Sequence, residues 1–319
     1  MKEIELEVYC DEQFLDKERY IVIGCLFIQA NKREEVINNL MNYRCLLKEN
    51  QIWHKDEKSC PYYNNGCKKD WHELNNSIIH FSEIREGRTN QAVIKIAKKW
   101  LHLIIENNKN DRNYIFFNIL YLDKKKLELK KFGSKDIDGN IYNRFFRTAL
   151  KAGIKYFFSD FDKITIKGVY HHRGSMSSHK FFPELNLEKL KADLPENVII
   201  ENYIIKFLFG DHKKENDDRN QLIQYINLII GSISYIIFYP TDNKAKREIA
   251  TVIRDLAKRL LENPKNKNSQ YKYYKRQQIN FFPKEKIKNA PYILSINGDL
   301  LELHANQFYS NVKMTSSQG

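Results

Sequence analysis

The segment IELEVYCDEQFLDKERYIVIGCLFIQA, residues 4–30, decides the fold of this chain. It contains two apolar runs, one that ends at Cys10 and one over 20–28, joined by a short charged connection. Both runs are rich in β-branched and aromatic residues, which favour a pleated and buried surface. The pattern predicts a β-hairpin with Asp11 and Glu12 at the end of its first strand. Carboxylates there can hold a divalent cation against a rigid sheet, although acids at a strand end are also ordinary turn residues.

The composition is that of a folded protein with a basic surplus. The chain has 319 residues, of which 42% are hydrophobic and 29% charged, which excludes a disordered chain. Its formal net charge of +13 predicts a polyanionic partner such as DNA or RNA. Five cysteines without dense spacing favour a reducing compartment, and the N-terminus has no apolar signal core. We therefore expect a cytoplasmic protein.

One uncharged segment, residues 222–239, is just long enough for a short membrane span. It contains Gln224, Asn227, Ser232 and Ser234, and the rest of the chain is too polar for a membrane protein. We therefore predict a helix that is buried on most faces, and no membrane partner.

Helical and strand periodicities alternate after the hairpin. Helices are expected over 31–50, 90–106, 142–150, 183–192 and 221–238, and strands over 114–121, 164–170 and 198–208. This alternation predicts an α/β domain with a mixed sheet. We expect the domain to cover residues 1–240, with an insertion loop over 51–76, and a basic C-terminal extension to cover 241–319.

Residues 241–290 carry most of the basic surplus. They hold 14 Lys and Arg against five acidic residues, a net charge of +9, with Tyr and Phe between the charges. Such a segment can follow phosphates and stack on bases, although a solvated helix face followed by a basic loop gives the same pattern. The expected nucleic-acid-binding residues are Arg247, Arg254, Lys258, Lys272, Lys275 and Arg276.

Acidic residues lie at the ends of several apolar elements. Two-metal hydrolysis of a phosphodiester needs three or four acids that converge from separate elements on two divalent cations. Taken singly, each acid has the ordinary explanation of a solvated surface residue. The candidates are Asp11 and Glu12 in the hairpin, Glu83 after His80-Phe81-Ser82, and Asp217 and Asp218 before the uncharged segment.

The order of these motifs resembles the domain-of-unknown-function family 3800, which has a ribonuclease H-like fold. The shared features are a strand with Asp-Glu, a His-x-x-Glu segment at 80–83, and Asp217-Asp218-Arg219 before Ile223-Gln224-Tyr225-Ile226-Asn227. The resemblance covers about residues 5–240. It implies a ribonuclease H-like mixed β-sheet flanked by helices and a nuclease that hydrolyses DNA or RNA with Mg²⁺ or Mn²⁺. It also implies antiviral defence, or defence against other mobile elements, in a complex with a partner protein.

The resemblance also implies roles for individual residues. Asp11 would bridge the two metals, and Glu12 would help only if the strand has ended, because strand alternation otherwise points it to the other face. The implied catalytic residues are Asp11, Glu83, Asp217 and Asp218, and the implied metal ligands are Asp11, Glu12, Glu83, Asp218 and Asn227.

The chain departs from the family pattern at two positions of the site. Asn227 stands where the family has Asp, and an amide brings no charge to a cation. His171-His172-Arg173 follows the strand over 164–170, where the family often has Asp, and histidine prefers softer metals. These three residues would be accessory groups, with a histidine as general base or phosphate contact. The departures support a second hypothesis, a catalytically impaired module that binds nucleic acid or a partner protein.

A second set of candidate ligands lies in the insertion loop. Two thiolates and two imidazoles satisfy tetrahedral Zn²⁺, and the residues concerned are His54, Cys60, Cys67 and His72. Their spacing contains no Cys-x-x-Cys pair, so a polar loop with reduced thiols is the favoured explanation.

Overall fold

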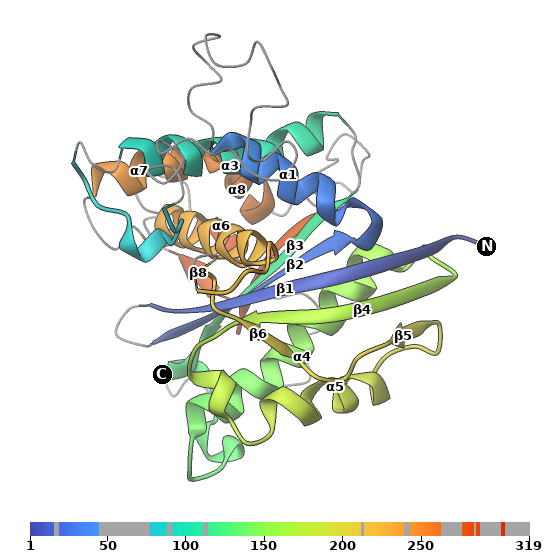
Figure 1. Cartoon of the computed structure of the whole chain (residues 1–319). Helices are drawn as coiled ribbons and strands as arrows, with labels where there is room; N and C mark the ends of the chain where they lie inside the picture. Colours follow the sequence, from blue (N-terminus) through green and yellow to red (C-terminus); the bar gives the residue numbers. More distant parts are fainter. Residues whose placement is uncertain are drawn as a thin grey trace.

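A mixed sheet of seven strands forms the centre of the protein (Figure 1). The computed structural model describes residues 1–15, 19–44, 77–87, 91–110, 114–211, 214–238, 243–262, 276–283, 285–287 and 301–303. The strands of the sheet are β1 (Glu3–Leu15), β2 (Tyr20–Gln29), β3 (Ile115–Asp123), β4 (Lys163–His172), β5 (Val198–Ile200), β6 (Lys206–Leu208) and β7 (Gln277–Phe282). A separate pair is formed by β8 (Glu285–Ile287) and β9 (Leu301–Leu303).

The strand order is β5-β4-β1-β2-β3-β7, and β6 also pairs with β4. Strand β2 is antiparallel to β1 and β3, whereas β1 with β4, β4 with β5 and β6, and β3 with β7 are parallel pairs. Strand β2 therefore runs against the other six strands of this sheet. The prediction of an α/β fold with a mixed sheet flanked by helices is confirmed.

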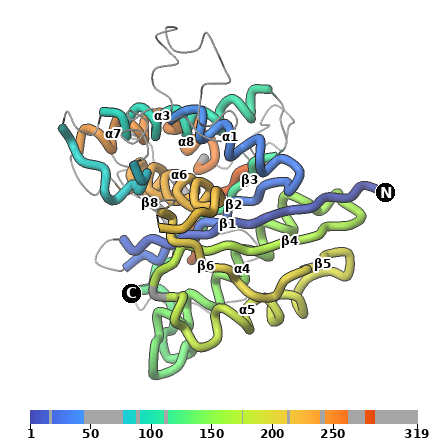
Figure 2. The backbone as a smooth tube through the Cα atoms, viewed as in Figure 1, coloured from blue at the N-terminus to red at the C-terminus, as the bar shows by residue number. Residues whose placement is uncertain are grey.

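Helices cover both faces of the sheet (Figures 1 and 2). On one face α6 (Asn220–Phe238) lies against the hairpin, below α1 (Arg33–Tyr43), α3 (Gln91–Lys109), α7 (Lys244–Thr251) and α8 (Arg254–Glu262). On the other face lie α4 (Ile137–Phe158) and α5 (Phe182–Ala192). Two separate apolar cores result, one on each side of the sheet.

Helix α6 is the uncharged segment of the sequence. Its length and composition would allow it to cross a membrane, but 89% of its most apolar window is buried inside the structure. The predicted helix buried on most faces is confirmed, and the structure is compatible with a soluble protein.

The first strand of the hairpin is longer than predicted. Strand β1 continues past Cys10 to Leu15, and it pairs Asp11 with Gly24 and Glu12 with Ile23 on β2. The prediction that the two acids end this strand is wrong, because the ladder to β2 continues through both of them. Alternation along the strand therefore directs Asp11 toward α6 and Glu12 toward α4.

Two further strands differ from their predicted bounds. Strand β4 includes both histidines that were expected in a loop, and it pairs His171 with Cys10 on β1. The expected strand over 198–208 is two short strands, β5 and β6, which both pair with β4. His172, the next residue of β4, thus lies beside Asp11, the next residue of β1.

Helix α6 approaches the hairpin closely at Gly24. A Cβ atom on this residue would lie 2.3 Å from Cδ1 of Ile230, so only glycine allows the helix to rest this near to β2. The close approach brings Asn227, one turn earlier in α6, over Asp11.

Part of the predicted organisation lies outside the described residues. The insertion loop over 51–76 and its four candidate zinc ligands, His54, Cys60, Cys67 and His72, belong to this part, as do Lys272 and Lys275. In the described part of the C-terminal region, β7 pairs with β3 and so extends the main sheet. The basic C-terminal extension stays a prediction.

Candidate functional site

A buried carboxylate lies at the centre of the sheet, on the face covered by α6. The side chain of Asp11 is on β1, and the residue is 1% exposed. Its Oδ2 accepts a hydrogen bond from Nδ2 of Asn227 at 2.7 Å, and its Oδ1 accepts one from the Glu12 backbone N–H at 2.9 Å. Nδ1 of His172 lies 3.4 Å from the same Oδ1. Three elements, β1, β4 and α6, therefore meet at one carboxylate.

The orientation of the Asn227 amide follows from its neighbours. Its Oδ1 accepts the backbone N–H of Phe81 at 2.9 Å, while its Nδ2 faces Asp11 and lies 3.1 Å from Nε2 of His80. Reversing the amide would place a donor against the Phe81 N–H and an oxygen against a carboxylate oxygen. Asn227 therefore acts on Asp11 as a hydrogen-bond donor.

His80, the residue just before the short 3-10 helix η4 (Phe81–Glu83), completes this network. Since its Nε2 accepts from Asn227, its proton is on Nδ1, which lies 2.7 Å from Oγ of Ser82. Burial lowers the pKa of His80, so the ring is neutral. The rings of His80, which contacts Asn227, and His172, which lies beside Asp11, have centroids 5.9 Å apart. We call Asp11, His80, His172 and Asn227 the Asp11 network.

The charges of the Asp11 network are set by opposing effects. Burial acts to raise the pKa of Asp11, but hydrogen bonds from His172 and Asn227 hold it below its usual value. Burial acts to lower the pKa of His172, and the neighbouring Asp11 carboxylate raises it above its usual value. The network thus contains an ionised carboxylate beside an imidazole that retains its proton toward neutral pH.

His172 lies at the opening of the network. Its side chain is 25% exposed, whereas that of Asp11 is 2% exposed. The backbone of Phe209 is a hydrogen-bond partner of the His172 ring, and Gly210 lies against the same ring. Gly210 has a φ of 66°, and a Cβ atom there would lie 3.0 Å from Cδ2 of His172. Glycine is required at this position for both reasons.

A second polar group lies on the other face of the sheet. His171 is completely buried, and its Nε2 lies 2.6 Å from the hydroxyl of Tyr142 on α4. Its Nδ1 lies 2.7 Å from the carbonyl oxygen of His172. The carbonyl can only accept, so Nδ1 carries the proton and Nε2 accepts from the tyrosine hydroxyl. Burial lowers the pKa of His171 to about 4, which keeps the ring neutral.

Glu12 belongs to this second group. Its Oε2 lies 3.4 Å from Nε2 of His171 and has no hydrogen-bond partner among the described residues. Burial, together with the charge of Asp11, raises the pKa of Glu12 to about 8. The carboxyl is therefore protonated at neutral pH, and Glu12 does not supply a charge to the Asp11 network.

The other acids predicted for the site make different contacts. Glu83 is exposed on η4, where its charge acts on His80. Asp218 is exposed, and Asp217 accepts the Arg219 backbone N–H at 2.9 Å and lies 3.5 Å from the Arg219 guanidinium. Among the described residues, Asp11 is the carboxylate that bonds to Asn227 and lies beside His172.

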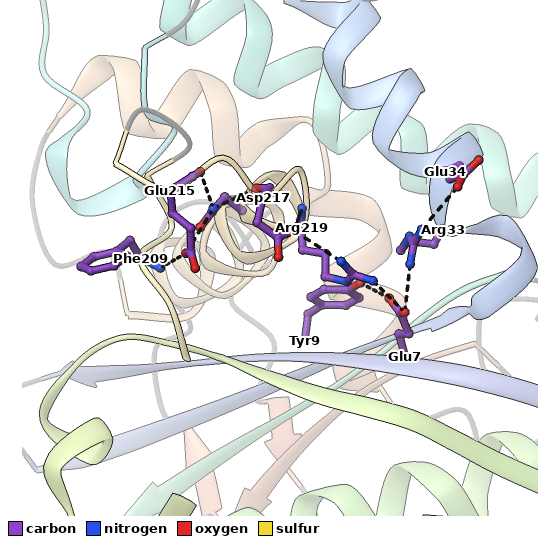
Figure 3. A network of polar contacts seen from close by, with 9 residues as sticks. Glu7, Tyr9, Arg33, Glu34, Phe209, Glu215, Asp217 and Arg219 are labelled. Carbon is purple, nitrogen blue, oxygen red and sulfur yellow. Dashed lines mark hydrogen bonds and ion pairs between the residues drawn. The ribbon is translucent and has the colours of Figure 1, made fainter. Parts of the chain in front are cut away.

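A salt-bridge cluster that sequence reasoning missed joins Asp217 through Arg219 to Glu7 (Figure 3). Arg219 lies 3.4 Å from Oε1 of Glu7, and Arg33 donates to the same oxygen at 3.1 Å. Glu7 also accepts a hydrogen bond from the hydroxyl of Tyr9. The signal available in the sequence was the odd-numbered spacing of Glu7, Tyr9 and Asp11, which places all three on one face of β1.

The donor set does not fit a pair of Mg²⁺ or Mn²⁺ ions. Such a pair needs several carboxylates, and here one carboxylate is surrounded by an amide donor and two imidazoles. Within the described ranges, no group of three or more His, Cys, Asp or Glu side chains is arranged to hold a metal ion.

One of the predicted nucleic-acid-binding residues is buried inside the fold. Arg276 is 4% exposed, and its guanidinium lies against the carbonyl oxygens of Asn107 and Asn108, so it holds β7 to the end of α3. Arg254 donates to Asp255 at 3.1 Å on α8. The remaining described members, Arg247 and Lys258, lie on α7 and α8.

No protein-family model, curated protein or solved structure matches this chain. The function must therefore be inferred from the side chains themselves.

Proposed function

We propose that this protein is a nucleic-acid-binding module with a ribonuclease H-like fold whose site is impaired for two-metal hydrolysis. The fold proposal is supported by the mixed sheet with helices on both faces and by an acid on its central strand, as the resemblance to family 3800 implies. The net charge of +13 supports a DNA or RNA partner. We further propose a cytoplasmic location and a role as one subunit of a defence complex.

The hydrogen bond from Asn227 to Asp11 carries the proposal. A metal-binding carboxylate must present its oxygens to a cation, and here Oδ2 already accepts from an amide that Phe81 holds in place. Asp217 is bonded to Arg219, and among the described residues neither Glu83 nor Asp218 forms a hydrogen bond with Asp11. The geometry favours a site closed by hydrogen bonds over one that holds two cations.

Binding and cleavage assays on one set of substrates test this function. The purified chain is incubated with labelled single- and double-stranded DNA and RNA in Mg²⁺ or Mn²⁺, beside Asp11→Asn. We expect salt-dependent binding without cleavage, and binding unchanged by the substitution. Absence of binding at low salt would overturn the proposal.

A second candidate function, phosphodiester hydrolysis, is favoured by one observation. A buried ionised carboxylate beside an imidazole of raised pKa, at a partly open site, is typical of acid–base chemistry. In this function a water molecule forms the new bond to phosphorus and loses its proton to solvent, while the P–O bond to the leaving oxygen breaks. Asp11 orients His172, which gives its proton to that leaving oxygen. Cleavage by the wild type that is lost in both Asp11→Asn and His172→Gln would replace the first proposal with the second.

A further inference from the structure

Exposed apolar side chains gather at one edge of the sheet. Eight large hydrophobic residues are exposed among those described, and five of them lie between positions 181 and 209. These five are Phe181 (47% exposed), Ile199 (41%), Tyr203 (36%), Ile204 (56%) and Phe209 (39%). Exposed apolar groups collected in one region mark an interaction surface more often than the same residues scattered singly.

The edge is held together by backbone contacts. Strand β6 pairs with β4, and the Arg173 N–H donates to the carbonyl oxygen of Leu208 at 2.8 Å. The Ile205 N–H donates to the carbonyl oxygen of Pro183 at 2.9 Å, which ties the segment to the start of α5. Figure 1 shows β5 and β6 along this side of the molecule, next to α5.

Two of the exposed rings are each paired with a cation. The guanidinium of Arg173 lies 4.5 Å from the ring centre of Phe209, and Nζ of Lys180 lies 5.5 Å from that of Phe181. All four side chains are exposed. An aromatic ring beside a cation is the combination that binds a base and its phosphate together. We call these four residues the aromatic edge.

The aromatic edge is continuous with the Asp11 network. The Phe209 backbone is a hydrogen-bond partner of the His172 ring, and Arg173 follows His172 directly in the chain. In Figure 3 the Phe209 ring points away from the cluster of Arg219 and Glu7, while its backbone N–H donates to Glu215 at 3.3 Å. A strand of nucleic acid bound at the ring of Phe209 would thus have its next phosphate near His172.

We propose that the aromatic edge, formed by Arg173, Lys180, Phe181 and Phe209, binds single-stranded nucleic acid and leads it toward His172. The inference rests on the proposed nucleic-acid function and adds to it the strandedness of the ligand. Bases in a duplex are stacked on each other and offer no face to a protein ring, whereas unpaired bases do. Charge complementarity selects this ligand over an apolar protein partner, because a cation lies at each of the two rings.

The structure offers a matched pair of variants. Phe209→Ala removes a ring of the aromatic edge, and Phe14→Ala removes an equally exposed ring near the C-terminal end of β1, on the face of Glu12 rather than that of Asp11, at 39% and 41% exposure respectively. Binding is measured by fluorescence anisotropy with labelled oligo(dT) and oligo(rU) of about 12 nucleotides, within the range of site sizes for one domain. A blunt duplex of the same length is the third ligand.

We expect Phe209→Ala to weaken single-strand binding roughly 5- to 150-fold, the equivalent of one lost base stack, and Phe14→Ala to leave it unchanged. Arg173→Gln should weaken binding and reduce its salt dependence. Duplex binding should be weaker than single-strand binding in the wild type and insensitive to Phe209→Ala.

The failures are distinguishable. If the wild type binds single strands and Phe209→Ala binds them equally well, the aromatic edge is wrong and the proposed function stands. If the wild type binds no nucleic acid even at low salt, the proposed function itself fails. If instead sedimentation shows a dimer that Phe209→Ala dissociates, the edge is an interface between copies of the chain, and the inference is overturned.

Discussion

Nδ2 of Asn227 lies 2.7 Å from Oδ2 of Asp11, and this bond joins helix α6 to the central strand of the sheet. The same amide is held by the Phe81 N–H and faces His80. One neutral side chain thus satisfies a backbone donor, a buried charge and an imidazole. Four predictions follow from this and the neighbouring contacts.

Asn227→Asp should destabilise the protein and create a response to cations. The new carboxylate would replace a donor to Asp11 with a second negative charge, which we expect to cost roughly 1–3 kcal/mol of unfolding free energy. Mn²⁺ should restore part of this loss, because two acids and two imidazoles now face one another. Thermal unfolding with and without Mn²⁺ measures both effects. Asn227→Ala is the control, since it removes the donor without adding charge. Equal stabilisation of the wild type by Mn²⁺ would contradict the closed network.

Tyr142→Phe should destabilise the protein, whereas Tyr225→Phe should not. The Tyr142 hydroxyl donates to the buried Nε2 of His171, and its loss leaves that nitrogen unsatisfied at a cost of roughly 1–3 kcal/mol. The Tyr225 hydroxyl is equally buried but has no hydrogen-bond partner among the described residues. Urea denaturation compares the two variants. A similar loss in both would show that ring packing, and not the hydrogen bond, is responsible.

Stability should fall as the pH rises from about 6.5 to about 8, and Glu12→Gln should reduce this fall. The folded pKa of Glu12 is raised to about 8, so the folded state keeps a proton that the unfolded state has already released. The stability contributed by this proton is fully present below the pKa of Glu12 in the unfolded state. It is lost as the pH rises through the pKa of Glu12 in the folded state. Between pH 6.5 and pH 8 the loss is roughly 1.6 kcal/mol.

His172 also has a raised pKa and acts in the same direction, so the slope should decrease in Glu12→Gln without disappearing. His171 and His80, whose pKa values are lowered, affect stability below about pH 6.5. Urea unfolding at three pH values between 6.5 and 8 is the measurement. A slope that is unchanged in the variant would show that Glu12 is ionised in the folded protein.

Gly24→Ala should cost roughly 1–3 kcal/mol through overpacking, and Ile230→Val should recover part of it. The added Cβ would lie 2.3 Å from Cδ1 of Ile230, the atom that valine lacks. Chemical denaturation of both single variants and the double variant gives the coupling energy. Additive losses would mean that α6 shifts as a whole in Gly24→Ala. Such a shift would weaken the contact between Asn227 and Asp11, and the pH dependence of the unfolding free energy should then change.

The sequence was most informative about elements and least informative about where they end. The apolar runs and helical stripes identified the mixed sheet and the buried helix α6, because burial imposes a regular period on the chain. The sequence predicts Asp11-Glu12 at the very end of one strand and His171-His172 after the end of another, since polar pairs usually interrupt an apolar run. In the structure both pairs continue their strands: Asp11 and Glu12 pair with Gly24 and Ile23 on β2, and His171 pairs with Cys10 on β1.

Distances between acids could not be read from sequence order. Asp217 lies only two residues before Arg219, and the local ion pair with that arginine and Glu7 determines its position. Burial of Arg44 and Arg276 was also unexpected, because an arginine enters a core only where amide and carbonyl oxygens are gathered to receive it. For Arg44 those oxygens come from Gln221, Gln224 and Ser77, which are far apart in the chain.

The alternation of Asp11 and Glu12 along one strand links the chemistry of the two faces of the sheet. The negative charge on Asp11 helps to keep Glu12 protonated on the opposite side. Any ligand that neutralises Asp11 from the open face would therefore make Glu12 a stronger acid behind it. Binding of such a ligand beside Asp11 on one face of the sheet would therefore release a proton from Glu12 on the other face, although the two residues are adjacent in the chain.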